Sequence, residues 1–142
     1  MLQSIRPKYV FVAIMVLEVV LHWNVWTLDR MGIHAWRQTQ TMTVVENFAS
    51  EDMNILNPRI NSRGDGDGIF RMEFPLMQWT FAWFYKSFGA HLTIARLLTF
   101  TISFISVIGF YRLLRGYGIS KPISALGTWC FTWSPLMFYY AV

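Results

Sequence analysis

Charged residues are scarce in this sequence of 142 residues, and cysteine is nearly absent. Asp, Glu, Lys and Arg make up 14% of the chain, whereas an average soluble domain carries about 25%. The single cysteine, Cys130, excludes an intrachain disulfide and any motif that requires paired cysteines. Apolar residues make up 54% of the chain and aromatic residues 18%. This composition predicts an integral membrane protein.

Several familiar catalytic and binding motifs are also missing. The sequence contains no Walker-type glycine loop for phosphate, no serine or cysteine nucleophile motif and no calcium-hand loop. The net charge of +4 comes from basic residues that are scattered along the chain, and this pattern does not favour nucleic acid as a partner. The function therefore has to be sought in the arrangement of the few charged residues.

Three apolar segments are long enough to cross a bilayer, and they are residues 9–28, 93–111 and 123–142. At ~1.5 Å per residue, a helix of about 20 residues covers the hydrocarbon core of ~30 Å. The basic stretches at residues 6–8 and 112–121 are both expected in the cytoplasm, because short loops rich in Lys and Arg stay inside. The sequence thus predicts a multi-pass protein of the plasma (inner) membrane, with a cytoplasmic N-terminus and an outer loop over residues 29–92.

Two polar residues interrupt the first apolar segment. Glu18 and His22 are four residues apart, which places them on one face of a helix. A charged group at the centre of a bilayer costs at least ~2.5 kcal/mol, so this face should meet protein or water instead of lipid. A polar contact between helices is favoured, and a direct catalytic role is the alternative.

The outer loop carries most of the charge. Seven of the eight acidic residues and five arginines fall within residues 29–75. Residues 35–48 have apolar side chains at helical spacing, which predicts an amphipathic helix along the membrane surface. Residues 61–68 alternate glycine with polar residues and are expected to be irregular.

A second helix is expected at the end of this loop, over residues 76–88. It would be about 20 Å long, too short to span a bilayer comfortably. Placing it in the membrane would also move the two basic stretches to opposite sides. We therefore predict an interfacial helix on the outer face, with Trp79, Trp83 and Tyr85 at headgroup depth.

Four short motifs follow these segments in order, and they are Glu73-Phe74-Pro75-Leu76, Phe88-Gly89, Ala95-Arg96-Leu97 and Ser134-Pro135. With a first span and a surface helix before them, they resemble the N-terminal part of the GT-C membrane glycosyltransferases. They resemble in particular the relatives of the protein O-mannosyltransferases and the lipid A aminoarabinose transferases. The resemblance covers nearly the whole chain. It implies an all-α membrane protein, of which residues 1–142 form the N-terminal part with three transmembrane helices and interfacial helices in the outer loop.

The resemblance also implies an activity. Such enzymes transfer a hexosyl or pentosyl group from a polyprenyl-phosphate donor to a glycan, lipid or protein acceptor outside the membrane. In that family a carboxylate of the first outer loop acts as the base, and basic residues hold the donor phosphate. This chain has Arg37-Gln38 where the family has Asp-Glu. Three spans are too few to enclose such a site, so the 142-residue chain is expected to be inactive alone.

Sugar transfer requires a carboxylate that takes the proton of the acceptor hydroxyl. Glu73 is the first candidate, because it lies next to the membrane and just before Pro75, whose ring restricts the backbone. Asp65 and Asp67 are the next candidates. An ordinary ion pair of Glu73 with a neighbouring arginine, Arg71 or Arg63, is an equally open interpretation. Asp65-Gly66-Asp67 also has a form that can bind a divalent cation, although glycine turns produce the same pattern by chance.

Cations are needed to stabilise the charge on the departing phosphate. Arg37, with Gln38 beside it, and Arg63 are favoured because a guanidinium grips phosphate oxygens in a bidentate manner. Contacts with lipid headgroups or solvated ion pairs are the alternative. His34 could share a proton with a carboxylate or cap the surface helix. Arg96 matches the family's arginine at the outer end of a span, and snorkelling to headgroups explains it as well.

Two other classes of protein fit the sequence less well. A non-catalytic membrane subunit would bind a lipid or a partner through the outer loop. A transporter half would place its polar residues near the middle of the bilayer, whereas here they concentrate outside it.

Overall fold

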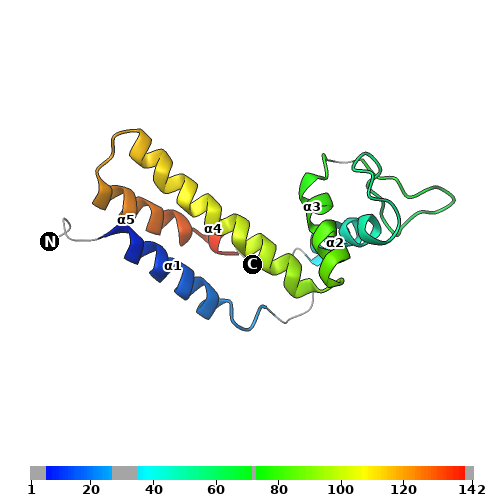
Figure 1. Ribbon diagram of the computed structural model, residues 1–142, viewed down its shortest axis with the longest axis horizontal. Helices are drawn as coiled ribbons and strands as arrows, with labels where there is room; N and C mark the ends of the chain where they lie inside the picture. The colour runs from blue at the N-terminus through cyan, green and yellow to red at the C-terminus, as the bar shows by residue number, and fades with distance from the viewer. Residues whose placement is uncertain (1–5, 27–34, 72, 140–142) are drawn as a thin grey trace. The chain divides into compact units, whose positions relative to one another are not determined.

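The computed structural model describes residues 6–26, 35–71 and 73–139, and all the regular structure within these ranges is helical (Figure 1). The helices are α1 (Pro7–Leu21), α2 (Ala35–Ser50), α3 (Leu76–Phe88), α4 (Leu92–Gly116), α5 (Lys121–Thr132) and α6 (Pro135–Tyr139). The chain divides into two compact units. The first unit comprises residues 1–26 and 96–142, and the second comprises residues 27–95.

α4 could cross a membrane. It has 25 residues, and its most apolar 18-residue window has a mean hydropathy of 1.8 with 11% of the window buried. Among the described residues it is the one helix that is long and apolar enough for this role. The prediction of a helix over residues 93–111 is confirmed, and the helix extends to Gly116.

The other two apolar segments form shorter helices than the sequence predicted. α1 begins at Pro7, which suits a first turn because proline has no backbone N–H to leave unpaired. It ends at Leu21 after 15 residues, about 22 Å. Residues 22–26 form turns, and residues 27 and 28 lie outside the described part. The prediction of one helix over residues 9–28 was therefore wrong in its bounds.

The third apolar segment is broken. α5 ends at Thr132, and Trp133 and Ser134 separate it from α6, which begins at Pro135. Proline lacks the N–H that would continue the hydrogen bonds of α5. A single helix over residues 123–142 was thus a wrong prediction, and its last three residues lie outside the described part.

Small polar residues line the buried side of α5. Ser124, Thr128 and Thr132 recur every fourth residue and are buried, and α5 packs against α1. The hydroxyls of Thr128 and Thr132 donate to the carbonyls four residues earlier, at 2.8 and 2.9 Å. The hydroxyls of Thr128 and Thr132 are thus hydrogen-bonded within their own helix, and no buried hydroxyl of these two residues lacks a partner. Small side chains also let two helices approach closely.

Glu18 and His22 make a polar contact inside the first unit. Nδ1 of His22 lies 3.2 Å from the Glu18 carboxylate, and both residues are buried. Nε2 of His22 donates to the carbonyl oxygen of Phe138 in α6 at 3.1 Å. The predicted polar contact between helices is confirmed.

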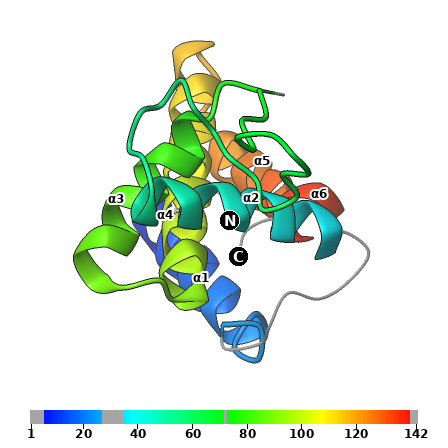
Figure 2. The ribbon, with the colours of Figure 1, turned by 90° about the vertical axis from the view of Figure 1, so that its right-hand side faces the viewer.

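In the second unit, α2 packs against α3 (Figure 2). Their buried apolar side chains are Met42, Val44, Val45, Phe48, Phe81, Ala82 and Tyr85. Both helices were predicted, α3 with the observed bounds and α2 two residues shorter. Tyr85 is buried with its hydroxyl 3.8 Å from Sδ of Met42, so its side chain belongs to the core of this unit, and its position at headgroup depth stays a prediction. Of its two partners in that prediction, Trp79 donates to the Met53 carbonyl at 2.8 Å, and Trp83 is exposed.

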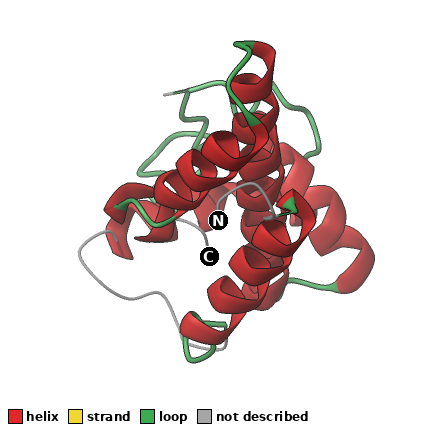
Figure 3. Ribbon diagram, turned by 90° about the vertical axis from the view of Figure 1, so that its left-hand side faces the viewer, coloured by secondary structure: helices red, strands yellow, loops and turns green. Residues whose placement is uncertain are grey.

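Between α2 and α3, the described residues 51–71 and 73–75 form turns and loop without a helix (Figure 3). A single antiparallel bridge joins Arg59 to Ile69. The N–H of Ile60 donates to the Gly68 carbonyl at 3.0 Å, and the N–H of Phe70 donates to the Pro58 carbonyl at 2.7 Å. Residues 58–70 therefore form a narrow hairpin, which we call the loop hairpin. The prediction of irregular backbone is confirmed for its tip.

Candidate functional site

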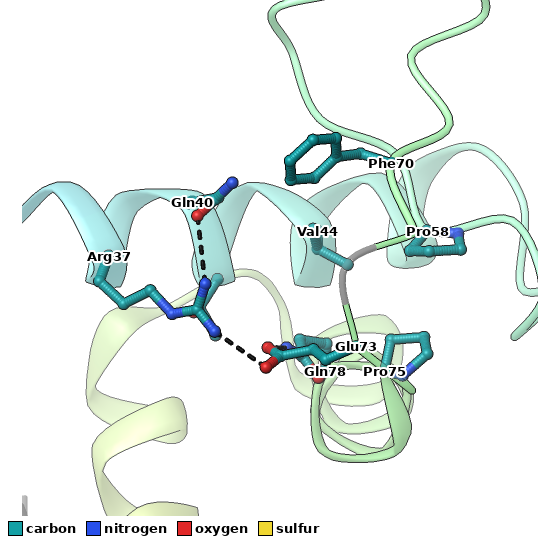
Figure 4. A pocket seen from close by; sticks show the side chains of 9 residues that line it. Arg37, Gln40, Val44, Pro58, Phe70, Glu73, Pro75 and Gln78 are labelled. Carbon is teal, nitrogen blue, oxygen red and sulfur yellow. Dashed lines mark hydrogen bonds and ion pairs between the residues drawn. The ribbon is translucent and has the colours of Figure 1, made fainter.

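The loop and the two helices of the second unit meet at a charged pair. Nη2 of Arg37, in the first turn of α2, donates to Oε2 of Glu73 at 2.9 Å (Figure 4). Nε2 of Gln78, in the first turn of α3, donates to Oε1 of Glu73 at 3.1 Å. Nη1 of Arg37 also donates to Oε1 of Gln40 at 3.4 Å. Each oxygen of the Glu73 carboxylate is thus held by a different helix.

Local sequence explains this placement. Glu73 lies two residues before Pro75, the N-cap residue of α3, so the chain places it close to a helix start. Gln78 follows in the first turn and is buried, whereas the side chains of Arg37 and Glu73 are 43% and 51% exposed. An ion pair this exposed contributes about 0–1 kcal/mol to stability. The pair is therefore weak enough to open for a ligand.

Beside the pair lies a small hollow (Figure 4). Its polar lining comes from Arg37, Gln40, Thr41, Glu73 and Gln78, and its apolar lining comes from Val44, Pro58, Phe70 and Pro75. The hollow has a free volume of about 30 Å³, which is room for roughly one water molecule. The hollow is too small for a phosphate or a sugar with the side chains as they lie in this structure.

Arg63, predicted to hold phosphate with Arg37, belongs to a different cluster. Its Nη2 donates to Oε1 of Glu51, and Nη1 of Arg59 donates to Oε2 of the same carboxylate at 3.1 Å. Arg63 does not line the hollow. The interpretation that Glu73 pairs with Arg71 or Arg63 was wrong, because its partner is Arg37, 36 residues earlier in the chain.

The cluster around Glu51 leads to a prediction about the stability of the loop hairpin at acidic pH. Hydrogen bonds from Arg63 and Arg59 lower the pKa of Glu51 from its ordinary value of 4.5. A carboxylate with a lowered pKa in the folded state stabilises the fold above pH 4.5, and this stability is lost as the pH falls through the lower folded pKa. Digestion by pepsin, followed as the pH is lowered, should therefore cut the loop hairpin more readily below pH 4.5.

Glu51→Gln is the matching variant, because its side chain cannot titrate. We expect this variant to lose the part of the increase in cleavage at low pH that protonation of Glu51 causes. A contribution from Asp52 stays, since hydrogen bonds from Asn57 and from the Asn54 N–H also lower the pKa of Asp52. Equal acid profiles for the variant and the unaltered protein would contradict the prediction.

The two aspartates predicted as alternative bases lie at the tip of the loop hairpin. Asp65 and Asp67 are exposed, and neither lines the hollow. Oδ1 of Asp67 accepts the N–H of Ile69 at 3.0 Å, which closes a turn. Among the described residues no three His, Cys, Asp or Glu side chains gather to hold a metal ion. A divalent cation at Asp65-Gly66-Asp67 stays a prediction.

Two further predicted binding residues, Gln38 and Arg96, are not part of this hollow. Gln38 is exposed and does not line it. Arg96 belongs to the first unit, where its Nη1 donates to the Val25 carbonyl. His34 lies outside the described residues.

Of the nine residues that line the hollow, only Arg37 and Glu73 were predicted as site residues, and the missed ones include Gln40, Gln78 and Phe70. Gln40 follows Arg37 by one helical turn, so helical spacing would have favoured it over Gln38. Gln78 is the polar residue in an otherwise apolar first turn of α3, which was a signal for a satisfied polar contact. Phe70 gave no sequence signal. No protein-family model, curated protein or solved structure matches this chain.

Proposed function

We propose that the chain is part of a membrane glycosyltransferase of the GT-C type. It would move a sugar from a polyprenyl-phosphate donor to an acceptor on the outer face of the plasma (inner) membrane. The observation that best supports this function is the Glu73 carboxylate, held between Arg37 and Gln78 at the edge of a hollow. This arrangement brings together a carboxylate that can accept a proton and a cation that can bind phosphate.

The membrane arrangement belongs to the same proposal. α1, α4 and the broken pair α5–α6 would cross the bilayer, with the N-terminus in the cytoplasm and residues 29–92 outside. Large apolar side chains on α1 and α4 support it because they are exposed, and examples are Val12, Val20, Leu21, Leu97 and Ile105. Lipid would cover these side chains. α1 is shorter than the hydrocarbon core, and local thinning of the bilayer accommodates such a mismatch at modest cost.

The ion pair suggests how donor binding prepares the base. Without a donor, Arg37 neutralises Glu73. The donor phosphate carries negative charge and competes for the same guanidinium, which binds phosphate in a bidentate manner. When Arg37 turns to the phosphate, Glu73 loses its ion-pair partner but stays hydrogen-bonded to Gln78. The freed carboxylate takes the proton of the acceptor hydroxyl as the hydroxyl oxygen attacks the sugar, and Arg37 stabilises the phosphate that leaves.

A non-catalytic membrane subunit is the second candidate. The small volume of the hollow favours it, because the hollow holds roughly one water molecule and no larger ligand. An exposed Arg–Glu pair is also expected in a purely structural contact. Such a subunit would bind a lipid or a partner protein through the second unit without supplying a base.

The transfer assay tests the proposed function directly. Native membranes are supplied with polyprenyl phosphate that carries a radiolabelled sugar, and label in lipid, glycan and protein fractions is measured. We expect transfer to disappear when the gene for this chain is deleted and to return when it is restored. Unchanged transfer after the deletion, for each sugar offered, would contradict the proposal.

A further inference from the structure

The first unit contains a buried polar pair that the proposed function does not use. Glu18 lies in the last turn of α1, His22 is the C-cap residue of that helix, and the two are 4% and 7% exposed. The ring of Phe138 lies against the imidazole, with 4.5 Å between the ring centroids. A charge in apolar surroundings is costly unless an opposite charge and hydrogen bonds compensate for it. The position of the protons on this pair therefore affects the packing of the unit.

Both ring nitrogens of His22 face groups that only accept hydrogen bonds. Nδ1 lies 3.0 Å from the carbonyl oxygen of Glu18, and Nε2 lies 3.1 Å from the carbonyl oxygen of Phe138. A neutral imidazole has a hydrogen on one nitrogen and a lone pair on the other. It can donate to only one of these carbonyls, and its lone pair repels the other. The two hydrogen bonds therefore require two protons on the ring.

Glu18 supplies the negative charge that a doubly protonated imidazole needs. Its Oε2 lies 3.2 Å from Nδ1 of His22. This oxygen is buried, and it accepts no hydrogen bond from any residue that the structure describes. A buried carboxylate without compensation is costly, so each member of the pair balances the charge of the other. The pair as a whole is neutral, and it holds one proton more than a neutral histidine beside a carboxylate.

The other titratable groups on α1 and on the helices around it have different surroundings. On α4, Arg96 donates to the Val25 carbonyl and Arg115 donates to the Ile119 carbonyl. The ring of Tyr111 contacts a phenylalanine of α1 edge-on, and the side chain of Tyr139 in α6 lies outside the described part. The remaining groups of α1, α4 and α5 are exposed, and they are Lys8, Tyr9, Arg112, Lys121 and Cys130.

We propose that Glu18 and His22 form a buried proton-binding site that ties α1 to α6. The bound proton is the second ring proton of His22, and Glu18 is its counter-ion. When this proton leaves for water, the carboxylate keeps the remaining proton on the nearby Nδ1, because the negative charge attracts it. Nε2 then turns a lone pair to the Phe138 carbonyl, so the bond between the two helices is lost. The tie is present while the proton is bound and is lost as the pH rises.

The break between α5 and α6 gives this tie a consequence. α6 has five residues, and a helix this short is not stable on its own. Phe138 connects it to the rest of the unit, through its carbonyl to His22 and through its ring to Trp133, with 5.6 Å between the ring centroids. The bound proton therefore holds in place a short helix that its own hydrogen bonds do not stabilise. The site lies in the first unit, whereas the residues of the proposed transfer reaction belong to the second.

NMR of the full chain in phosphatidylcholine nanodiscs tests the protonation of His22. The histidines are labelled with nitrogen-15, and His22→Gln identifies the signal of His22. At about pH 7.5, an imidazole in water carries the second proton in about one molecule in ten. We expect both ring nitrogens of His22 to be protonated in most molecules. A His22 ring with one unprotonated nitrogen in most molecules overturns the site.

Two variants test the role of Glu18 as the counter-ion. Glu18→Gln keeps the size of the side chain and removes its charge, so the doubly protonated fraction of His22 should fall at least fivefold. Glu51→Gln is the same change in the second unit, and it should leave this fraction unchanged. An unchanged fraction in Glu18→Gln contradicts the proposal.

Amide hydrogen exchange tests the tie to α6. The N–H of Phe138 donates to the Ser134 carbonyl at 3.0 Å, in the first turn of α6. Its protection, relative to the unfolded chain at the same pH, should fall about tenfold between about pH 7 and about pH 9, because a hydrogen bond from a charged group is lost. His22→Gln still donates to the Phe138 carbonyl and does not titrate, so its protection should stay constant. His22→Phe cannot donate, and its protection should be low at both pH values.

The variants also define the results that overturn the tie. An equal fall in protection in His22→Gln and in the unaltered protein would mean that another group titrates. Equal protection of His22→Phe and the unaltered protein at about pH 7 would mean that His22 does not hold α6. A doubly protonated His22 together with a pH-dependent Phe138 amide supports the site, whether or not native membranes transfer sugar.

Discussion

Replacing Glu73 by glutamine should lower the rate of sugar transfer by two orders of magnitude or more. General base catalysis by a positioned carboxylate contributes about 10²–10⁴-fold. Glutamine has nearly the same size and can still accept a hydrogen bond from Gln78, but it cannot take a proton. The variant is introduced into the chromosomal gene, transfer is measured in native membranes, and the amount of protein is checked by immunoblot.

Loss of the ion pair does not by itself explain a decrease of this size. The pair is half-exposed, so its removal costs about 0–1 kcal/mol of stability and should leave the protein level nearly unchanged. Asp65→Asn and Asp67→Asn are the controls, because these residues lie at the loop tip and do not line the hollow beside Glu73. We expect both to keep full activity. Full activity in all three variants would leave no base in this loop and would favour the non-catalytic subunit.

Local signals in the sequence predicted the helices of the second unit well. α3 begins after Pro75 and ends before Gly89, whose φ is 90°. Proline near a helix start and glycine just past its end are strong boundary signals. α2 was predicted from helical spacing, and the same spacing places Val44, Val45 and Phe48 in the core. These elements were predictable because a few neighbouring residues determine each boundary.

The apolar segments of the first unit were harder to predict. Hydropathy marks which residues avoid water, but it does not mark where the helix ends. α1 stops at Leu21, and His22 bonds to a carbonyl in α6. α5 stops before Ser134-Pro135, a local break signal that lies inside an otherwise continuous apolar run. The apolar character of these segments was therefore predictable from hydropathy, whereas the ends of their helices depend on proline and on contacts between distant residues.

The site was predicted only in part. Glu73 and Arg37 were both singled out from the sequence, but for separate roles and without knowing that they pair. Arg71 and Arg63 were favoured as partners because they are near Glu73 in the sequence, and the fold instead brings in Arg37 from another helix. Contacts over such a separation depend on how α2 packs against α3. No local pattern in a single sequence contains that information.

Replacing Gly68 by alanine should destabilise the second unit by about 2–4 kcal/mol. Gly68 has a φ of +77°, in the left-handed region that side chains rarely adopt, which costs an alanine about 1–2 kcal/mol. Its Cβ would also lie 2.8 Å from the Ile60 carbonyl oxygen and 2.7 Å from Cγ of Arg63. The backbone contact cannot be relieved cheaply, because the Ile60 N–H bonds to the Gly68 carbonyl and closes the loop hairpin.

Gly66→Ala is the matched control at the tip of the same hairpin, and the comparison of the two variants tests the fold around the site. Gly66 has an ordinary φ, and its Cβ would meet the nearest atom, the Arg63 carbonyl oxygen, at 3.4 Å. We expect its stability to change by no more than about 0.5 kcal/mol. The stability of both variants is measured by thermal unfolding in detergent and by the rate of proteolysis within residues 58–70. Because the hairpin carries Pro58 and Phe70 to the hollow beside Arg37 and Glu73, Gly68→Ala should also lower the rate of sugar transfer. Equal stability of the two variants would mean that the hairpin does not form as described.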